Sequence, residues 1–293
     1  MRRLALACLA FAAFTAHEEA SATPACRPGA KWTDPAPPLK VFGNTYFVGT
    51  CGISAVLVTS ADGAVLIDAG VEEAAPLVEA NIRAAGVDLD RVRYILNSHE
   101  HQDHVGGLSA IARDTHAAVL AREPGATALE RGNGGPGDPQ IRSTKPFAPV
   151  AHVQRIADGD HVKLGAIDIT AHATPAHTPG STSWTWISCE GARCLRMAYA
   201  DSLTAMSDED YRFSDEAAHP GVLSAFRRSI AAVAALPCDI LLTPHPDASD
   251  LWHRVGPEAS AALVDATACK RYAATATRNL DARIARERGM AKP

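Results

Sequence analysis

The amino-acid sequence predicts an α/β protein whose strands and helices are layered around one core. Short apolar runs recur along the chain and end at polar or glycine residues, and segments with helical spacing of apolar residues stand between several of them. The alternation is clearest over residues 72–120, where helical and strand-like patterns follow one another in turn. A helical bundle or a pure β-sandwich would lack this alternation, so a layered α/β fold is expected.

Residues 1–22 have the pattern of a secretory signal peptide. Two arginines precede an apolar segment at residues 4–14, and Ala20-Ser21-Ala22 has the small residues of a cleavage site. The apolar segment is well short of the roughly 20 residues that a membrane-spanning helix needs. We therefore expect export to the periplasm, removal of this signal, and a single domain over residues 23–293.

The formal net charge of -5 gives no basic field for a phosphate backbone, so nucleic acid is not an expected partner and a small molecule is. After the signal the chain has six cysteines, in a compartment that permits disulfides: Cys26, Cys51, Cys189, Cys194, Cys238 and Cys269. Spacing alone fixes no pairing, although Cys189 and Cys194 flank a hairpin-like turn that favours a local bridge. The chain shows no heptads or other assembly signal, so we expect a monomer.

The first elements are expected to be strands. Residues 26–38 are rich in proline and predict an irregular arm. Apolar runs at residues 44–49, 53–58 and 64–67 are separated by turn residues, the pattern of successive antiparallel strands. Asp68 ends the last run, where a carboxylate either caps a helix or orients a metal-binding histidine.

A helix is predicted over residues 72–85, followed by a buried strand at residues 92–96. A second helix is expected at residues 105–113 and a short strand at residues 117–120. Residues 123–149 then turn to glycine, proline and polar side chains, and long loops of this kind are often lids or binding loops.

The C-terminal part is predicted to hold the remaining strands and two helices. Strands are expected within residues 156–170, which form a strand, a turn and a strand, and at residues 184–189, 195–200 and 239–242. Helices are expected at residues 222–236 and, as an alanine-rich amphipathic helix that closes the chain, at residues 257–286.

A dense group of metal-binding residue types follows the strand predicted at residues 92–96. His99 and His101 are separated by one residue, so an extended strand end directs both imidazoles the same way and one cation can take both. Asp103 and His104 come one turn later and can serve a second cation. The alternative is a histidine-rich surface loop, but a cluster of this density has little structural use without metal.

Two further histidines stand at strand ends, His177 between prolines and His245 after residues 239–242. Catalytic zinc commonly takes three protein ligands and keeps a position for water, so six ligands make two sites. We assign His99, His101 and His177 to the first zinc and Asp103, His104 and His245 to the second. Two zinc ions about 3.5 to 4 Å apart can share a hydroxide whose parent water has a pKa near about 7, which suits hydrolysis. Iron and manganese remain alternatives.

The sequence resembles the metallo-β-lactamase superfamily from about Val41 to the C-terminus, on its His-x-His-x-Asp-His motif with two following glycines, Asp68, and the isolated downstream histidines. The resemblance implies an αββα sandwich, in which two mixed β-sheets are flanked by helices and the metal site lies at one edge. Residues 200–204 and 236–246, together with residues 46–53, resemble the third subclass of class B β-lactamases.

That resemblance implies a zinc-dependent β-lactamase, in which a zinc-bound hydroxide opens the β-lactam amide bond of penicillins, cephalosporins and carbapenems and so gives antibiotic resistance. Asp103 would orient the hydroxide, and Ser202 and Thr204 would contact the substrate carboxylate, with turn capping as their alternative role. The disulfides implied are Cys26 to Cys51, Cys189 to Cys194, and Cys238 to Cys269. Independently of the resemblance, Gln140 on the long loop is either a substrate contact or a solvated amide.

Two other functions remain open. In a glyoxalase-II-like thioesterase an aspartate of a Gly-Asp-Thr-Leu segment bridges the metals, and Asp201 has the matching place here. Export and the cysteine framework argue against it, because glutathione thioesters belong inside the cell. A zinc-storage protein without catalysis would gain nothing from open coordination positions or an adjacent loop. Tyr211 is a further candidate for polarising a carbonyl, although its sequence surroundings fix no role.

Overall fold

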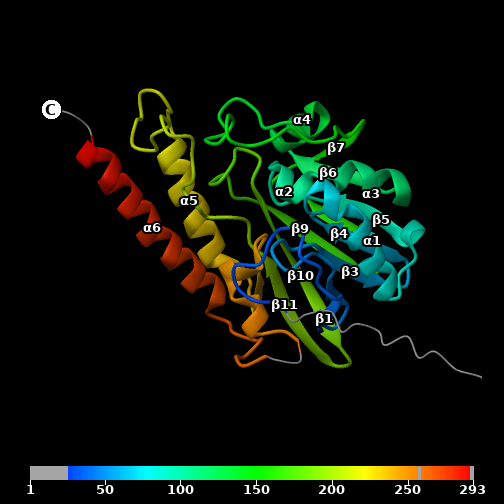
Figure 1. Ribbon diagram of the computed structural model, residues 1–293. Helices are drawn as coiled ribbons and strands as arrows, with labels where there is room; N and C mark the ends of the chain where they lie inside the picture. The colour runs from blue at the N-terminus through cyan, green and yellow to red at the C-terminus, as the bar shows by residue number, and fades with distance from the viewer. Residues whose placement is uncertain (1–25, 257–258, 291–293) are drawn as a thin grey trace, which may run out of the picture.

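The computed structural model describes residues 26–256 and 259–290, and the predicted signal peptide lies outside these residues (Figure 1). The strands form two sheets, one of seven strands in the order β1-β2-β3-β4-β5-β6-β7 and one of five in the order β12-β11-β10-β9-β8. Figure 1 shows α1, α2 and α3 on one side of the sheets and α5 and α6 on the other. The predicted sandwich of two mixed sheets between helices is confirmed.

The seven-stranded sheet is antiparallel from β1 to β4 and parallel from β4 to β7. The change follows from the connections, because parallel neighbours need a crossover and helices supply it. The strands are β1 (Leu39–Phe42), β2 (Thr45–Phe47), β3 (Val56–Ser60), β4 (Gly63–Ile67), β5 (Val92–Leu96), β6 (Ala118–Arg122) and β7 (Val153–Ile156). The intervening helices are η1 (Glu72–Ala74), α1 (Ala75–Ala84), η2 (Leu89–Arg91), α2 (Gln102–Val105), α3 (Leu108–Thr115) and α4 (Gly125–Arg131).

The five-stranded sheet is antiparallel except where β12 joins β11. Its strands are β8 (His161–Leu164), β9 (Ile167–Ala173), β10 (Thr182–Glu190), β11 (Arg193–Tyr199) and β12 (Ile240–Leu242). Helix α5 (Val222–Ala235) provides the crossover between β11 and β12, and η3 (Pro246–Ser249), η4 (Leu251–His253) and α6 (Ala268–Met290) complete the chain. The C-terminal ends of β5, β9 and β12 therefore carry the segments in which the candidate histidines lie.

Strand β4 shows how alternation builds the core. Its odd-numbered Val65 and Ile67 enter the apolar layer between the two sheets, whereas Ala64 and Leu66 face α1 and α3 on the outside. All five residues of β4 are buried, as expected for a strand covered on both faces. A third apolar cluster lies beneath α5 and α6.

The helix predicted at residues 105–113 is instead two helices, because the chain turns at its pair of glycines. The Gly107 N–H donates to the Gly70 carbonyl at 3.0 Å and thus leaves the helical ladder. A Cβ on Gly107 would lie 2.6 Å from the Ala69 carbonyl oxygen, and one on Gly106 would lie 2.6 Å from the Glu72 nitrogen. Only glycines permit this approach, which brings α2 against the end of β4.

Two more predictions of secondary structure were wrong in part. Residues 123–149 are not all loop, since α4 buries Ala126 and Leu129 in the apolar layer outside the sheet and ends at Gly132 in the left-handed conformation. The last helix begins at Ala268 and not at residue 257, because Asp265 starts it: its Oδ1 accepts the Thr267 N–H at 2.8 Å. Residues 257–258 lie outside the described part of the chain.

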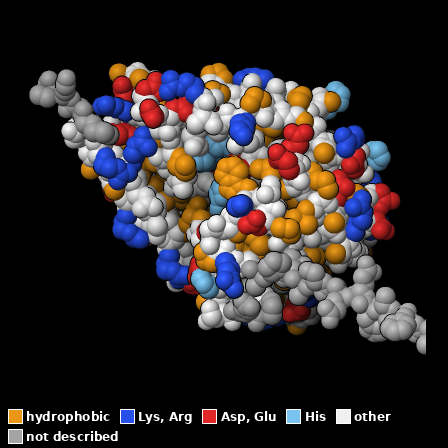
Figure 2. Space-filling model, viewed as in Figure 1, with side chains coloured by type: hydrophobic (Ala, Val, Ile, Leu, Met, Phe, Trp, Pro, Cys, Tyr) orange, Lys and Arg blue, Asp and Glu red, His pale blue; other side chains and the backbone are white. Residues whose placement is uncertain are grey.

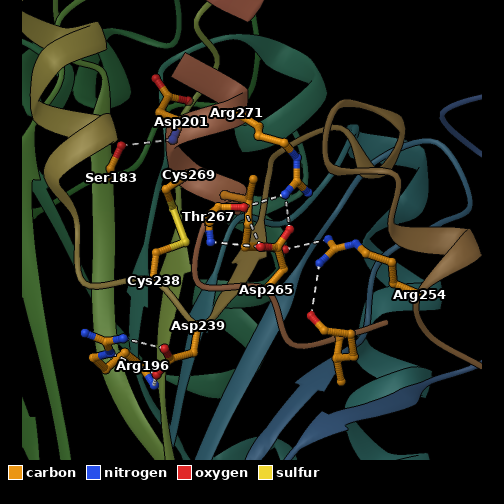
Figure 3. The surroundings of a disulfide bond; sticks show 12 residues. Ser183, Arg196, Asp201, Cys238, Asp239, Arg254, Asp265, Thr267, Cys269 and Arg271 are labelled. Carbon is orange, nitrogen blue, oxygen red and sulfur yellow. Dashed lines mark hydrogen bonds and ion pairs between the residues drawn. A yellow bond between two sulfur atoms is a disulfide. The ribbon is translucent and has the colours of Figure 1, made fainter. Parts of the chain in front are cut away.

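The three implied disulfides are present, Cys26–Cys51, Cys189–Cys194 and Cys238–Cys269. The second closes the β10–β11 hairpin, where the two cysteines are paired in register. Figure 3 shows the third, which ties the segment before β12 to the first turn of α6. None of the helices in the described ranges is long and apolar enough to cross a membrane.

Candidate metal centre

Five histidines and one aspartate converge where β5, β9 and β12 end. His99 contacts His101, His104 and His177, with ring centroids 4.9, 4.2 and 4.8 Å apart. His245 reaches the group through His104, with centroids 4.9 Å apart. Figure 2 shows histidine atoms recessed between other side chains on this face. The structure thus brings together all six side chains that the sequence analysis assigned to metal.

Two sets of three could each hold a metal ion, His99 with His101 and His177, and His99 with Asp103 and His104. Within each set the ligand atoms lie within 4.8 Å of one another, and all of these residues are buried. His245 belongs to the second group by contact, since its Nε2 lies 3.4 Å from Asp103 Oδ2, and its side chain is 34% exposed. The two sets meet at His99, so the cluster is one centre.

Asp201 orients His99. Its Oδ1 lies 2.8 Å from His99 Nδ1, and a carboxylate accepts, so the imidazole proton lies on Nδ1. His99 Nε2 is buried and has no hydrogen-bond partner in the described chain. Burial, together with His104 and His177, lowers the pKa of His99 well below its usual value, so the ring is neutral and Nε2 offers a lone pair to a metal.

Asp138 performs the same task for His101, and the sequence analysis missed it. Both of its carboxylate oxygens lie close to His101 Nε2, at 3.2 and 3.1 Å, which leaves Nδ1 for the cluster. Asp138 lies in the glycine-rich segment after α4, far from the histidine motif in sequence. The only feature of the sequence that could have indicated this role is that Asp138 stands two residues before Gln140, which was a candidate substrate contact.

Thr204 holds His177. Both its carbonyl oxygen and its Oγ1 lie 3.0 Å from His177 Nδ1, so the proton is on Nδ1 and Nε2 faces the cluster. Burial and the nearby His101 lower the pKa of His177 to about 4. The side-chain nitrogen of Gln140 lies 3.3 Å from His177 Nε2 and 3.4 Å from His101 Nδ1, so this predicted residue reaches the centre. Ser202, two residues before Thr204 in the chain, is buried.

Glu100, between two of the histidines in sequence, ties two segments of the centre together. It accepts a hydrogen bond from the Thr178 hydroxyl at 2.7 Å and another from the Gly180 N–H at 3.0 Å. Both donors closely follow His177 in the chain. The alternation that directs the neighbouring histidines one way could have indicated that Glu100 points the other way.

The second group is more strongly charged. Asp103 Oδ2 lies 3.1 Å from His104 Nε2. Burial raises the pKa of Asp103, but His104 and the other histidines outweigh burial, so the net shift is downward and the carboxylate is ionised. Burial likewise lowers the pKa of His104, but Asp103, Asp68 and Asp201 outweigh it and raise the value to about 9. Burial lowers the pKa of His245 to about 4.

Asp68 lies behind His104, with Oδ2 3.6 Å from His104 Nδ1. It accepts three hydrogen bonds, from the Ser98 N–H and hydroxyl at 2.6 and 2.7 Å and from the Tyr199 hydroxyl at 2.7 Å. Burial raises its pKa to about 6. Of its two predicted roles, its position favours orienting a histidine, because the helices after it have no side-chain cap.

Tyr211 packs against a histidine that is not among the metal-binding residues. Its ring stacks on His219 with centroids 3.8 Å apart, and burial raises its pKa to about 12. Its hydroxyl is buried and makes no hydrogen bond within the described chain, so no hydrogen bond of this hydroxyl reaches the six metal-binding residues.

The family described as the metallo-beta-lactamase superfamily matches residues 48–245. Among solved structures, the metallo-β-lactamase MIM-1 from Novosphingobium pentaromativorans is 47% identical, with a TM-score of 0.87 over 92% of this chain and 98% of that one. MEM-A1, a subclass B3 metallo-β-lactamase from a soil metagenome library, is 45% identical, with a TM-score of 0.85 over 89% of this chain and 100% of that one.

Curated relatives match over shorter stretches. A hydroxyacylglutathione hydrolase of Anaeromyxobacter dehalogenans is 34% identical over 130 residues, which are 44% of this chain and 40% of that protein. The uncharacterized protein YobT of Bacillus subtilis is 29% identical over 154 residues, 49% of this chain and 61% of that protein. The chain therefore spans less than two thirds of the length of either.

Proposed function

Because the chain belongs to the metallo-β-lactamase superfamily and is similar in structure to subclass B3 enzymes, we propose that it hydrolyses β-lactam antibiotics with two zinc ions. One observation carries the proposal: five histidines and one aspartate meet at one edge of the sandwich, and outer carboxylates or carbonyls orient three of the histidines toward one another. Penicillins, cephalosporins and carbapenems are the proposed substrates.

The side chains present fit zinc. His99 Nε2 and both ring nitrogens of His104 are buried and make no hydrogen bond in the described residues, although Asp103 Oδ2 lies 3.1 Å from His104 Nε2. Buried polar atoms are nearly always paired, so a cation at this place would satisfy nitrogens that make no hydrogen bond in the described part of the chain. Imidazole nitrogen with one carboxylate oxygen is also a donor set that zinc accepts.

We assign three ligands to each ion. The first would be held by His99, His101 and His177, and the second by Asp103, His104 and His245. When bound, two such ions would polarise the lactam carbonyl and lower the pKa of a water molecule. Asp201, Asp138 and Thr204 hold the second nitrogen of each first-site ring and so determine which nitrogen faces the metal.

The protein's own groups would position the reactants. Asp103 is ionised, so it can accept a hydrogen bond from the attacking water and orient it toward the carbonyl. The Ser202 and Thr204 hydroxyls would donate hydrogen bonds to the substrate carboxylate. Thr204 is exposed, and its carbonyl also accepts a hydrogen bond from His177, so its hydroxyl is free to turn toward the substrate. The Gln140 amide also reaches this centre, where it lies 3.3 Å from His177 Nε2. Export by residues 1–22, a periplasmic location and a monomeric state belong to the same proposal.

The test uses purified mature protein, residues 23–293, with zinc measured by elemental analysis and hydrolysis of a carbapenem followed by absorbance. We expect two zinc ions per chain, loss of hydrolysis on chelation and recovery when zinc is returned. His177→Ala should lower the rate by more than the roughly 10- to 100-fold that loss of an outer contact costs. Exposed His161, on β8, is the control: His161→Ala should leave the rate unchanged. Undiminished hydrolysis after complete removal of metal would contradict the proposal.

A glyoxalase-II-like thioesterase is the second candidate, favoured by the match to a hydroxyacylglutathione hydrolase. Its bridging aspartate would correspond to Asp201. Here Asp201 pairs with His99 Nδ1, on the side of the ring away from the free Nε2, and this position supports the β-lactamase proposal. Turnover of lactoylglutathione compared with that of a carbapenem separates the two functions.

A further inference from the structure

We propose that Asp138 is a positioning residue that holds His101 with Nδ1 toward the histidine cluster, and that it thereby makes the glycine-rich segment of residues 132–149 part of the metal centre. The inference rests on the proposed metal site and concerns what builds it. It implies that a segment without any metal ligand controls the affinity of the first zinc.

The Asp138 carboxylate is fixed in one place. The side chain is buried, and both oxygens lie within 3.2 Å of His101 Nε2. A Cβ on Gly134 would lie 2.4 Å from Asp138 Oδ2, so only a glycine lets the carboxylate occupy this position. Asp138 Oδ1 also accepts the Gln140 N–H at 2.8 Å. These contacts hold the carboxylate against His101 Nε2.

The contact determines the tautomer of His101. A carboxylate oxygen accepts, so the proton must lie on Nε2 and the lone pair on Nδ1. The neighbouring His99 and His177 have the opposite arrangement, with their protons on Nδ1. Without Asp138 the ring would be free to turn or to take the other tautomer, and the first site would lose its ready third ligand.

The same turn places Gln140 at the centre and is anchored from outside. The Pro139 carbonyl accepts the Asp208 N–H at 2.8 Å, and Asp208 Oδ2 accepts the Arg142 N–H at 3.0 Å. Asp208 therefore supports the segment without touching a histidine. It provides a matched control, since it is also an aspartate that accepts backbone N–H bonds of this segment.

The experiment measures zinc affinity of the mature protein by competition with a chromophoric chelator, for the wild type and for Asp138→Ala, Asp138→Asn and Asp208→Asn. Loss of an outer carboxylate typically weakens metal binding roughly 10- to 100-fold, and we expect this loss at one site in Asp138→Ala. Asp138→Asn keeps one acceptor oxygen and should lie between. Asp208→Asn should change neither site by more than about threefold, within the scatter of such effects.

A second readout reports the ring itself. Proton–nitrogen correlation spectra of the zinc-loaded wild type should show one metal-bound histidine with its proton on Nε2, and this signature should be lost or exchange-broadened in Asp138→Ala. Equal affinity and an unchanged spectrum in Asp138→Ala would overturn the inference, as would equal losses in Asp138→Ala and Asp208→Asn, which would assign the effect to the fold of the segment. A wild type that binds no zinc would instead refute the proposed function.

Discussion

Replacement of Cys238 and Cys269 by alanine should free α6 from β12 and lower the free energy of unfolding. Both cysteines are buried, and their bond joins two segments on either side of a stretch that includes η3 and η4 (Figure 3). The sequence separation is 31 residues. Chain entropy then predicts a loss of about 3.7 kcal/mol at 25 °C, because the unfolded chain regains the freedom that a closed loop of this length removes.

The hairpin disulfide provides the matched control. Cys189 and Cys194 are exposed and separated by 5 residues. The same relation predicts a loss of only about 2 kcal/mol when both become alanine. The two double variants should therefore differ by about 1.6 kcal/mol, with the same number of cysteines removed.

The longer disulfide should also affect the metal centre. Helix α6 carries Tyr272, whose hydroxyl donates to the Asp201 carbonyl at 3.2 Å and accepts the Leu203 N–H at 3.1 Å. Asp201 in turn orients His99. A looser α6 should thus weaken zinc binding in the Cys238→Ala, Cys269→Ala variant and leave the hairpin variant unchanged.

Guanidinium unfolding of the zinc-free mature proteins, followed by far-UV circular dichroism, measures the stability difference, and chelator competition measures zinc affinity. Equal losses of stability in the two double variants, or a larger loss in the hairpin variant, would refute the loop-length reasoning. Unchanged zinc affinity in the Cys238→Ala, Cys269→Ala variant would refute the link through α6.

Three more predictions concern single groups. Tyr199→Phe removes a hydrogen bond to buried Asp68 and should cost about 1.5 to 3 kcal/mol in guanidinium unfolding, whereas a loss under about 0.5 kcal/mol would contradict it. Gly180→Ala places a Cβ 2.5 Å from a buried carboxylate oxygen and should weaken zinc binding, whereas Gly135→Ala, whose nearest neighbour is at 3.9 Å, should not. Because the pKa of His104 is about 9 without metal, zinc must displace its proton, so second-site affinity should rise about tenfold per pH unit below about 9; calorimetry in buffers of different ionisation heat that finds no proton release would disprove this.

Local patterns were enough to predict the layers and the assembly of the metal-binding residues. Each candidate histidine either closely follows a strand, as His99 and His245 do, or lies in the short helix after it, as His104 does. Strand ends at one edge of packed sheets lie near one another, so short sequence patterns at several strand ends predict that residues far apart in sequence lie close together in the fold. The structure brings the six residues together, and it confirms the αββα sandwich that the family resemblance implies.

The orientation of those residues depended on partners that no local pattern reveals. Asp138 reaches His101 from the segment after α4, and Asp201 reaches His99 from the end of β11. Sequence patterns also missed α4. The glycines and prolines from Gly132 onward led us to predict a loop there, whereas the short helix before them is stabilised by packing against the sheet. Residue types and their spacing along the chain determined which groups can bind metal. Tertiary packing alone decided which nitrogen each ring presents, because a hydrogen bond across the fold sets the tautomer.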